Sequence, residues 1–331
     1  MIYTKAVQIL KATIGIASNS ETHLPQLPFP IEVKSLHTDF FSVEEVPFQD
    51  DLDGYISIED SEEEAWYRVE KDTIHFRGPF NKMRTQSSDL RFTFWGNQGF
   101  LYRYTLFLLE KKHHIYNLHA CALYEKETQT LFVIIGGAGS GKTVYLLSGL
   151  AQGLQLFSTE TVHFSIEEGG IRWYLGSLLD NIRYGNLIYD FPQFLPPGPT
   201  PDPDQAWQKK IALDLSSYRT DFDEVLNPKS VVILFPHIEQ GRQGFQLTPV
   251  DDKRKSTKFL FDNISQKITE TVVLFDSLPF LGLDEEPLAV KRLNNIKHLM
   301  QHPSIRLTAS VLTNPKDCWG NLLNTQGENY E

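Results

Sequence analysis

Cysteine is scarce in this chain of 331 residues, with only Cys121 and Cys318 present. Two cysteines provide neither a disulfide framework nor the spacing of a zinc site. Scarce cysteine also suits a reducing compartment, in which disulfides do not persist. We therefore expect a cytoplasmic protein.

Long apolar runs are absent as well. No uninterrupted apolar stretch of the sequence reaches the length of a membrane span. Near the N-terminus, Lys5, Gln8 and Lys11 interrupt the continuous apolar core that a signal peptide requires. We expect no membrane partner.

Basic residues are fewer than acidic ones. The chain has 31 Lys and Arg and 42 Asp and Glu, which gives a net charge of −11. This balance argues against nucleic acid as the main partner. The compact basic cluster of Lys253–Lys255 and Lys258 is predicted to be a solvated helix face. With 41% hydrophobic residues, the chain can bury a sizeable core, as one large domain or two ordinary ones.

Residues 1–114 are predicted to form a mostly β N-terminal domain that ends in a helix. Several short segments alternate apolar and polar residues, which is typical of half-buried strands. These segments are Ile31–Lys34, Gly54–Ile58, Trp66–Val69, Thr73–Phe76 and Leu90–Trp95. From Gly99 to Lys112 the pattern becomes helical, with Leu101, Tyr104 and Leu108 on one apolar face.

Residues 115–331 are predicted to form a second, α/β domain. The expected strands are Ile115–Leu123, Leu131–Ile135, Leu154–Phe164 with an interruption at Ser158–Thr161, Ser230–Phe235, Gln246–Thr248 and Ile305–Thr313. The expected helices are Thr143–Gln152, with Gly153 as its C-cap, and Leu288–Met300.

The most specific motif is Gly136–Thr143, which reads Gly-Gly-Ala-Gly-Ser-Gly-Lys-Thr and lies between a predicted strand and a predicted helix. This is the pattern of a P-loop, whose backbone N–H groups and following helix N-terminus bind phosphates. The lysine of the motif reaches the β- and γ-phosphates, and the threonine hydroxyl ligates Mg²⁺. The predicted cofactors are therefore ATP and Mg²⁺. The predicted nucleotide-binding residues are Gly137, Ala138, Gly139, Ser140, Gly141, Lys142 and Thr143.

Phosphoryl transfer also needs an acidic group that holds Mg²⁺ or orients the attacking oxygen. One candidate is Asp276, which ends the apolar run Val272–Phe275 in the manner of the Mg²⁺-positioning strand of ordinary P-loop ATPases. The other is Glu160, at the end of the strand that follows the P-loop helix, where ligand sites of α/β proteins lie. His119, on the strand before the P-loop strand, is either a catalytic residue or a hydrogen-bonded core residue.

In combination, Leu118–Ala120, the P-loop, Gly153 and Ser158–Glu160 resemble the HPr kinase/phosphorylase-like kinases. The fold of that family is related to that of ATP-dependent phosphoenolpyruvate carboxykinase. The resemblance is continuous from Tyr116 to Phe164 and weaker over Lys229–Thr248. It implies an α/β P-loop kinase domain of the phosphoenolpyruvate carboxykinase type, preceded by a mostly β part. It also implies that His119 is the active-site histidine and that Glu160 is the second of two acidic residues.

The sequence departs from the family at the first acidic position, which is Thr159. In the family this position carries the base toward the acceptor hydroxyl, and threonine cannot serve as a general base near neutral pH. Three interpretations remain open. Glu160 performs both roles, another carboxylate such as Asp180 or Asp276 substitutes, or the protein binds ATP and transfers slowly or not at all.

The leading hypothesis is therefore an ATP-dependent kinase that phosphorylates a hydroxyl of a peptide, a protein or a small molecule. Lys142 stabilises the transferring phosphoryl group, Thr143 and Glu160 hold Mg²⁺, and His119 contacts the γ-phosphate or orients the acceptor. The alternatives are an ATP-binding regulatory protein that has lost catalysis and a P-loop ATPase that uses Asp276. The best-known relatives form rings, so we consider a homo-oligomer, although divergent members need not share that property.

Overall fold

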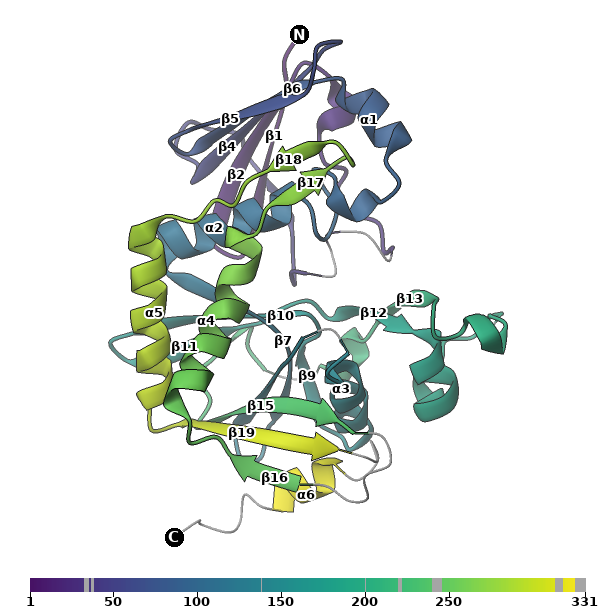
Figure 1. The fold of residues 1–331 in the computed structure, drawn as a ribbon, viewed down its shortest axis with the longest axis vertical. Helices are drawn as coiled ribbons and strands as arrows, with labels where there is room; N and C mark the ends of the chain where they lie inside the picture. Colours follow the sequence, from purple (N-terminus) through teal and green to yellow (C-terminus); the bar gives the residue numbers. More distant parts are fainter. Residues whose placement is uncertain are drawn as a thin grey trace. The chain divides into compact units, whose positions relative to one another are not determined.

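The computed structural model describes residues 1–32, 36, 39–137, 139–199, 201–219, 222–239, 246–312 and 318–324 (Figure 1). The chain divides into two compact units. The first consists of Met1–Tyr116 and Ser265–Lys291, and the second of Asn117–Ile264 and Arg292–Glu331. Both units combine sheets with helices, so the predicted α/β fold is confirmed at that level. No helix among the described residues is long and apolar enough to cross a membrane.

The first unit is built on a sheet that has the strand order β3-β1-β2-β4-β6-β5 over the described residues. The strands are β1 (Tyr3–Ile9), β2 (Ala12–Ser18), β3 (Glu44–Val46), β4 (Gly54–Asp60), β5 (Trp66–Glu70) and β6 (Thr73–Gly78). β2, β4 and β6 run parallel, whereas the β1–β2 and β5–β6 pairs are antiparallel hairpins. The predicted strands over β4, β5 and β6 are thus confirmed.

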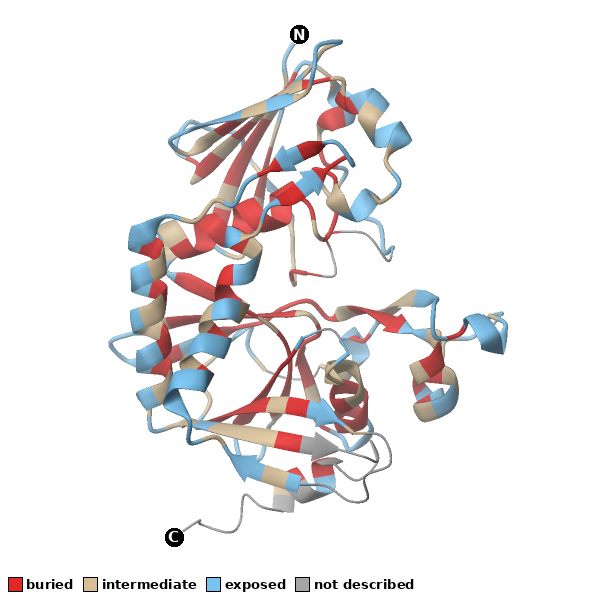
Figure 2. Ribbon diagram, viewed as in Figure 1, coloured by how far each residue is buried: buried red, intermediate tan, exposed pale blue. Residues whose placement is uncertain are grey.

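Helix α2 (Phe100–His113) confirms the helix that the sequence predicts over Gly99–Lys112. Its residues are buried from Phe100 to Glu110, as Figure 2 shows in red. A helix that is apolar on nearly every face is typical of a domain interior. The helix ends at His114, whose left-handed backbone (φ 56°) stops further helical turns.

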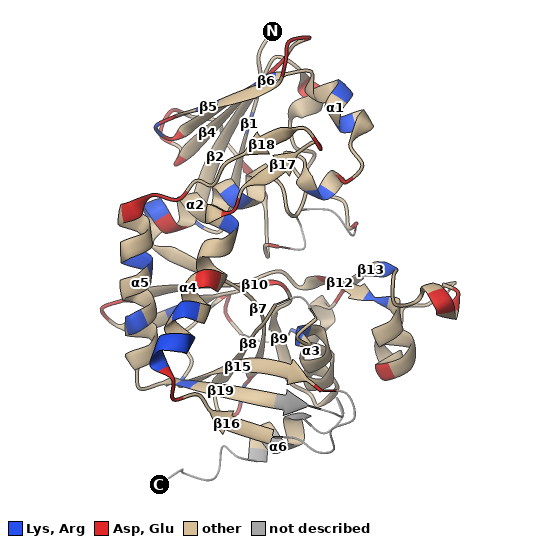
Figure 3. Ribbon diagram, in the orientation of Figure 1, with Lys and Arg blue, Asp and Glu red and all other residues tan. Residues whose placement is uncertain are grey.

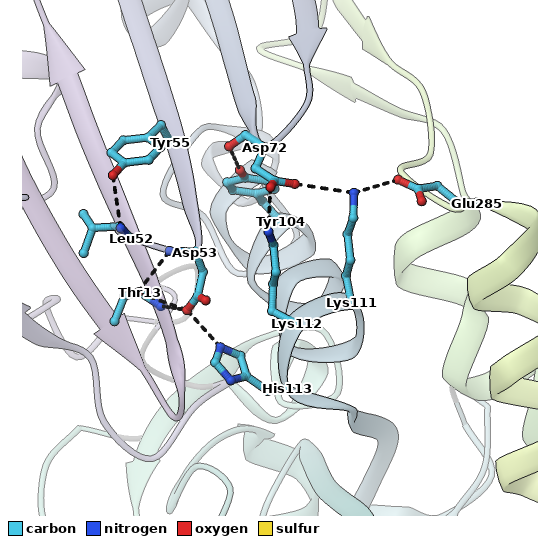
Figure 4. Close-up of polar contacts among 10 residues, drawn as sticks. All are labelled: Thr13, Leu52, Asp53, Tyr55, Asp72, Tyr104, Lys111, Lys112, His113 and Glu285. Atoms are coloured by element: carbon cyan, nitrogen blue, oxygen red, sulfur yellow. Dashed lines mark hydrogen bonds and ion pairs between the residues drawn. The ribbon is translucent and has the colours of Figure 1, made fainter. Parts of the chain in front are cut away.

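Polar contacts attach the last turn of α2 to the sheet (Figure 4). His113 Nε2 lies 2.8 Å from Asp53 Oδ2, and the same carboxylate oxygen accepts a hydrogen bond from the Thr13 N–H at 2.8 Å. Lys112 Nζ lies 2.6 Å from Asp72 Oδ2. Basic side chains in the last helical turn also interact favourably with the helix dipole. These contacts fix α2 against the ends of β2 and β4.

Two predictions in the first unit need correction. Leu90–Trp95 is not a strand, because Asp89 accepts a hydrogen bond from the Arg91 N–H and caps a 3₁₀ turn at Leu90–Phe92. Burial does not follow the alternating pattern, since Leu90 is exposed whereas Thr93 and Phe94 are both buried. Of the predicted strand Ile31–Lys34, Val33 and Lys34 lie outside the described residues, and Ile31 and Glu32 are not in a strand.

The remaining elements of this unit are α1 (Phe80–Gln86) and the hairpin of β17 (Val272–Leu274) and β18 (Leu278–Phe280). The hairpin belongs to the inserted segment Ser265–Lys291. It forms a two-stranded sheet of its own. The chain enters this segment within α4 (Lys253–Thr269) and leaves it within α5 (Glu286–Gln301).

The second unit is built on a sheet with the order β14-β11-β10-β7-β8-β15-β19-β16, and β9 also pairs with β7. The strands are β7 (Ile115–Glu125), β8 (Thr130–Ile135), β9 (Gln155–Ser158), β10 (Thr161–Glu167), β11 (Gly170–Tyr174), β14 (Val225–Leu226), β15 (Ser230–Ile238), β16 (Gln246–Pro249) and β19 (Ile305–Leu312). β8, β15 and β19 run parallel, and β7 is antiparallel to β8. The predicted strands are confirmed here, except that Thr313 lies outside the described residues.

Helix α3 (Lys142–Ala151) follows β8 directly, and α6 (Cys318–Asn324) packs against it. The strands β12 (Leu179–Arg183) and β13 (Lys210–Asp214) form a separate hairpin. Gly153 has a φ of +88° just after α3, in agreement with its predicted role at the helix end. The basic residues at the start of α4 are visible in blue in Figure 3.

Candidate functional site

The candidate site begins where β8 ends. β8 is buried along its whole length between β7 and β15, and the loop 136–141 follows its C-terminal end. Gly139 and Gly141 have φ values of +81° and +101°, a region that favours glycine. The loop then enters α3 at Lys142. The strand, glycine loop and helix of the predicted P-loop therefore occur in this order.

The loop geometry fits phosphate binding. Lys142 turns back over the loop, and its Nζ donates to the carbonyl of Gly136 at 2.7 Å. A Cβ on Gly137 or Gly139 would meet nothing within 4 Å, so space is open beside the backbone at both positions. The Ser140 hydroxyl oxygen is buried and makes no hydrogen bond with the described residues. Ala138, also predicted to bind nucleotide, lies outside the described residues.

His119 is positioned by the register of β7. Its neighbour Ala120 pairs with Ile135, the last residue of β8, so His119 lies beside the start of the loop. Its backbone is held by Asn263 of α4, whose Oδ1 accepts from the His119 N–H at 2.9 Å. The Asn263 amide in turn donates to the His119 carbonyl at 3.3 Å. Asn263 was not identified from the sequence, because no motif marks it.

Glu160 lies between β9 and β10, on the other side of β7. Its carbonyl accepts a hydrogen bond from the Ala120 N–H at 3.1 Å. β7 thus brings the start of the P-loop and Glu160 to the same end of the sheet. Thr143 is the second residue of α3.

Thr159 has a structural role in this arrangement. It is buried, and its hydroxyl lies 3.0 Å from the carbonyl oxygen of Ser177 and 2.6 Å from that of Leu179. Its backbone N–H also donates to Ser177 at 2.9 Å. The hydroxyl thus donates to backbone carbonyls, and a neutral threonine hydroxyl is too weak a base to take a proton near neutral pH. Instead, Thr159 fixes the segment that leads into Asp180.

Asp180, the first residue after that segment, is buried close to Glu160 and Lys142. Burial raises the pKa of Asp180 to about 8, and the negative charge of Glu160 acts in the same direction. The positive charges of Lys210 and Lys142 oppose this rise. The charges of Asp180, Glu160 and Lys142 all act on the buried thiol of Cys121, whose pKa is raised mainly by burial. Electrostatic influence thus links a lysine and two carboxyl groups that the motif alone did not connect.

Asp276 occupies a different setting. It belongs to the turn of the β17–β18 hairpin, in the first unit and outside the sheet that carries the P-loop. Its Oδ2 accepts a hydrogen bond from the Ser88 N–H at 2.6 Å. The strand Val272–Leu274 therefore lacks the position beside the P-loop strand on which the predicted Mg²⁺ role rested.

Among the described residues, no three His, Cys, Asp or Glu side chains gather into a metal-binding group. Mg²⁺ in nucleotide sites is usually bound by one or two protein ligands together with substrate phosphates and water. Thr143 and Glu160 are of the types that such a site uses.

Comparison with known proteins yields no matching family model and no matching curated protein. A search of solved structures finds similarity to the HPr(Ser) kinase/phosphatase from Coxiella burnetii. The identity is 13% and the TM-score 0.24, over 56% of this chain and 99% of that protein. Similarity at this level is too low to assign the chain to a family.

Proposed function

We propose that the chain is an ATP-dependent phosphotransferase that transfers the γ-phosphate to a hydroxyl group. The observation that supports this proposal is the glycine loop, with Lys142 folded over it, together with the charges of Glu160 and Lys142 that act on the buried Asp180. A P-loop alone accounts for nucleotide binding. Glu160, at the end of the sheet that carries the loop, and Asp180, on the β12–β13 hairpin, would supply what transfer additionally requires, a metal ligand and a proton acceptor.

Each residue has a distinct role in this proposal. Lys142 and the N–H groups at the start of α3 bind the phosphates, and Thr143 and Glu160 hold Mg²⁺. Bound Mg²⁺-ATP supplies the γ-phosphoryl group. His119 contacts that group or orients the acceptor. Asp180 takes the proton of the acceptor hydroxyl as the new O–P bond forms and the bond to ADP breaks.

Asp180 is assigned this role because Thr159, at the family's usual base position, is committed to backbone carbonyls. Burial raises the pKa of Asp180 above its ordinary value, and a higher pKa makes its carboxylate a stronger proton acceptor. Among the interpretations left open by the sequence, substitution by another carboxylate is therefore the one we adopt. A general base typically contributes about 10²–10⁴-fold to the rate.

The test is transfer from Mg²⁺-[γ-³²P]ATP to free serine, polyols and cell-extract components, measured for the wild-type protein, Asp180→Asn and Glu160→Gln. We expect both variants to bind ATP and to lose transfer, with Asp180→Asn reduced about 10²–10⁴-fold. Glu127→Gln, in the exposed turn between β7 and β8, is the control that should retain full transfer. Intact ATP binding without any transfer by the wild-type protein would exclude a kinase.

That outcome would favour the second candidate, an ATP-binding regulatory protein without catalysis. The buried, hydrogen-bonded Thr159 is the observation that supports it. In that case Glu160→Gln and Asp180→Asn should leave ATP affinity nearly unchanged. We do not adopt the third hypothesis, a P-loop ATPase that uses Asp276, because β17 pairs with β18 and is not a strand of the P-loop sheet.

A further inference from the structure

The first unit contains a cavity of about 390 Å³ that has no part in the proposed phosphotransfer. This volume falls within the range of small-molecule sites. Three stretches distant in sequence form its walls, namely residues 21–32, residues 80–96 and the β17–β18 turn at Phe275. All three belong to the same compact unit. The cavity is therefore a feature of the folded unit and not of one loop.

Aromatic rings form the inner wall of this cavity. The ring of Phe94 lies 5.0 Å from that of Phe80 and 4.9 Å from that of Phe275, centroid to centroid. Trp95 stands next to Phe94 at 5.9 Å, and Phe29 contributes a further ring to the lining. Rings in tilted and edge-to-face arrangements offer favourable contacts to another aromatic ring. The wall is thus suited to a flat, aromatic ligand group.

The position of Phe275 is imposed by an unusual backbone conformation. Phe275 and Asp276 have φ values of +52° and +60°, which are rare for a bulky residue such as phenylalanine. Two hydrogen bonds hold this turn, from the Phe275 N–H to Phe92 O at 2.9 Å and from the Ser88 N–H to Asp276 at 2.6 Å. Strained backbone that neighbouring contacts enforce is concentrated at functional sites. Here the strain places a ring in the cavity wall.

Charged groups of both signs accompany the rings. Arg84, an exposed residue of α1, lines the cavity together with Glu21 and Glu32. His23 also lines the cavity; it is buried, and its Nε2 lies 3.3 Å from Asp60 Oδ1. Burial lowers the pKa of His23 despite the opposing effect of Asp60. The cavity therefore offers one cation and two anions beside an aromatic interior.

We propose that this cavity binds a free aromatic amino acid. The side-chain ring would lie against the wall that Phe29, Phe94 and Trp95 contribute, the carboxylate would pair with Arg84, and the ammonium group would pair with Glu21 or Glu32. The aromatic wall, the guanidinium and the carboxylates are together complementary to the ring, the carboxylate and the ammonium group of a zwitterionic aromatic amino acid. It does not match an aliphatic amino acid, which lacks the ring, or a neutral aromatic compound, which leaves the charges unpaired.

Isothermal titration of the full-length protein tests the ligand class. The probes are L-phenylalanine, L-tyrosine and L-tryptophan, with L-leucine and N-acetyl-L-phenylalaninamide for comparison. We expect at least one aromatic amino acid to bind, and L-leucine and the blocked amide to bind at least ten times more weakly. Equal affinity for L-leucine or for the blocked amide would overturn the proposal, as would no binding of any aromatic amino acid at millimolar concentration.

Two variants on α1 locate the binding site. Arg84→Gln should weaken binding of the aromatic amino acid about tenfold or more, because a charge-assisted hydrogen bond is lost. Lys82→Gln, on the same helix but outside the cavity lining, should leave the affinity unchanged. Both side chains are exposed, so we expect both variants to fold. Unchanged affinity in Arg84→Gln would overturn the proposed site.

A peptide beginning with an aromatic residue shares the ring and the ammonium group with the free amino acid. Phe-Gly-Gly distinguishes a free amino acid from a peptide N-terminus, because its carboxylate lies two residues away from the phenylalanine. Weaker binding of Phe-Gly-Gly than of L-phenylalanine is the expected result. Tighter binding of the peptide would overturn the assignment to a free amino acid.

Discussion

At the scale of single residues, Lys142 is partly exposed to solvent, whereas Asp180 is buried and subject to the negative charge of Glu160. Lys142 lies at the N-terminus of α3, with its ammonium group hydrogen-bonded to the carbonyl of Gly136. Phosphate oxygens would take the place of that carbonyl as partners of the ammonium group. Asp180 lies in the interior, where burial and the charge of Glu160 disfavour the carboxylate.

Replacing Lys142 by alanine removes the cation that faces the β- and γ-phosphates. We expect ATP affinity to fall about tenfold or more, because hydrogen bonds to charged groups contribute about 1.5–3 kcal/mol. Fluorescence titration with a labelled ATP analogue measures the change. Lys126→Ala, in the exposed turn after β7, serves as the control. Wild-type ATP affinity in Lys142→Ala would contradict the assignment of the loop.

Asp180 should make stability depend on pH in a particular direction. Its pKa is about 8 in the folded protein and 3.8 in its ordinary state, so the folded state binds more protons between these values. Stability contributed by this group is therefore lost as pH rises through that window. Asp180→Asn should flatten the fall in Tm over this range, as measured by thermal unfolding at a series of pH values.

Glu160→Gln provides a second test, of the electrostatic coupling between Glu160 and Asp180. Removing the negative charge of Glu160 should lower the pKa of Asp180 and shift the pH dependence of Tm to lower pH. If neither variant alters the pH dependence of Tm, the two carboxyl groups are not coupled.

At the scale of elements, the P-loop depends on the backbone conformation of its glycines. Gly141 has a φ of +101°, and a Cβ there would meet the Ile238 side chain at 2.5 Å. Ile238 belongs to the end of β15, the parallel neighbour of β8. The loop and the adjacent strand are therefore packed against each other at this glycine.

Gly141→Ala should destabilise the protein by about 1–3 kcal/mol, because it combines an unfavourable φ with a steric overlap. Chemical denaturation without nucleotide measures this loss. Gly137→Ala is the matched control, since a Cβ there meets nothing within 4 Å. Its unfolding free energy should stay within about 0.5 kcal/mol of the wild type. Equal effects of the two substitutions would contradict the described loop conformation.

At the scale of the whole molecule, the first unit is completed by a segment from far along the chain. Residues Ser265–Lys291 belong to it, and the buried Arg103 of α2 is a main point of attachment. Its guanidinium lies 2.6 Å from Glu270 Oε1 and donates to the Lys267 carbonyl at 2.9 Å. The N-terminal unit therefore depends on residues that are synthesised after the P-loop.

Glu270→Gln should destabilise the first unit by about 1–2 kcal/mol at neutral pH, since it weakens the partner of a buried arginine but leaves an amide in place. Burial raises the pKa of Glu270, but the hydrogen bond from Arg103 and the charge of Lys267 outweigh this and lower it. The stabilisation is thus present above the ordinary pKa of 4.5 and is lost as pH falls through the lower folded value.

The measurement is urea denaturation of wild type and Glu270→Gln at pH 7 and at pH 3. The difference between the two proteins should shrink at the lower pH. Glu285→Gln, which removes an exposed pair with Lys111, should cost no more than about 1 kcal/mol. A larger effect of Glu285→Gln than of Glu270→Gln would contradict the role of the buried arginine.

The local sequence pattern was sufficient to predict several elements of the fold and the P-loop. The alternation in Thr73–Phe76, the helical spacing after Gly99 and the glycine spacing of Gly136–Thr143 all depend on neighbours within a few residues. Backbone preferences and periodicity act over that range, so β6, α2 and the P-loop could be predicted. The pattern was wrong for Leu90–Trp95, where capping by Asp89 formed a 3₁₀ turn instead.

Relations between distant residues required the folded chain. No spacing in the sequence connects Asp180 to Glu160, or shows that the Thr159 hydroxyl would be used by the carbonyls of Ser177 and Leu179. The placement of Asp276 in a hairpin of the first unit likewise follows from long-range packing. Such contacts depend on which surfaces exclude water together, and a local pattern does not contain that information. The sequence therefore predicts a nucleotide-binding loop, whereas the fold determines which carboxyl groups accompany it.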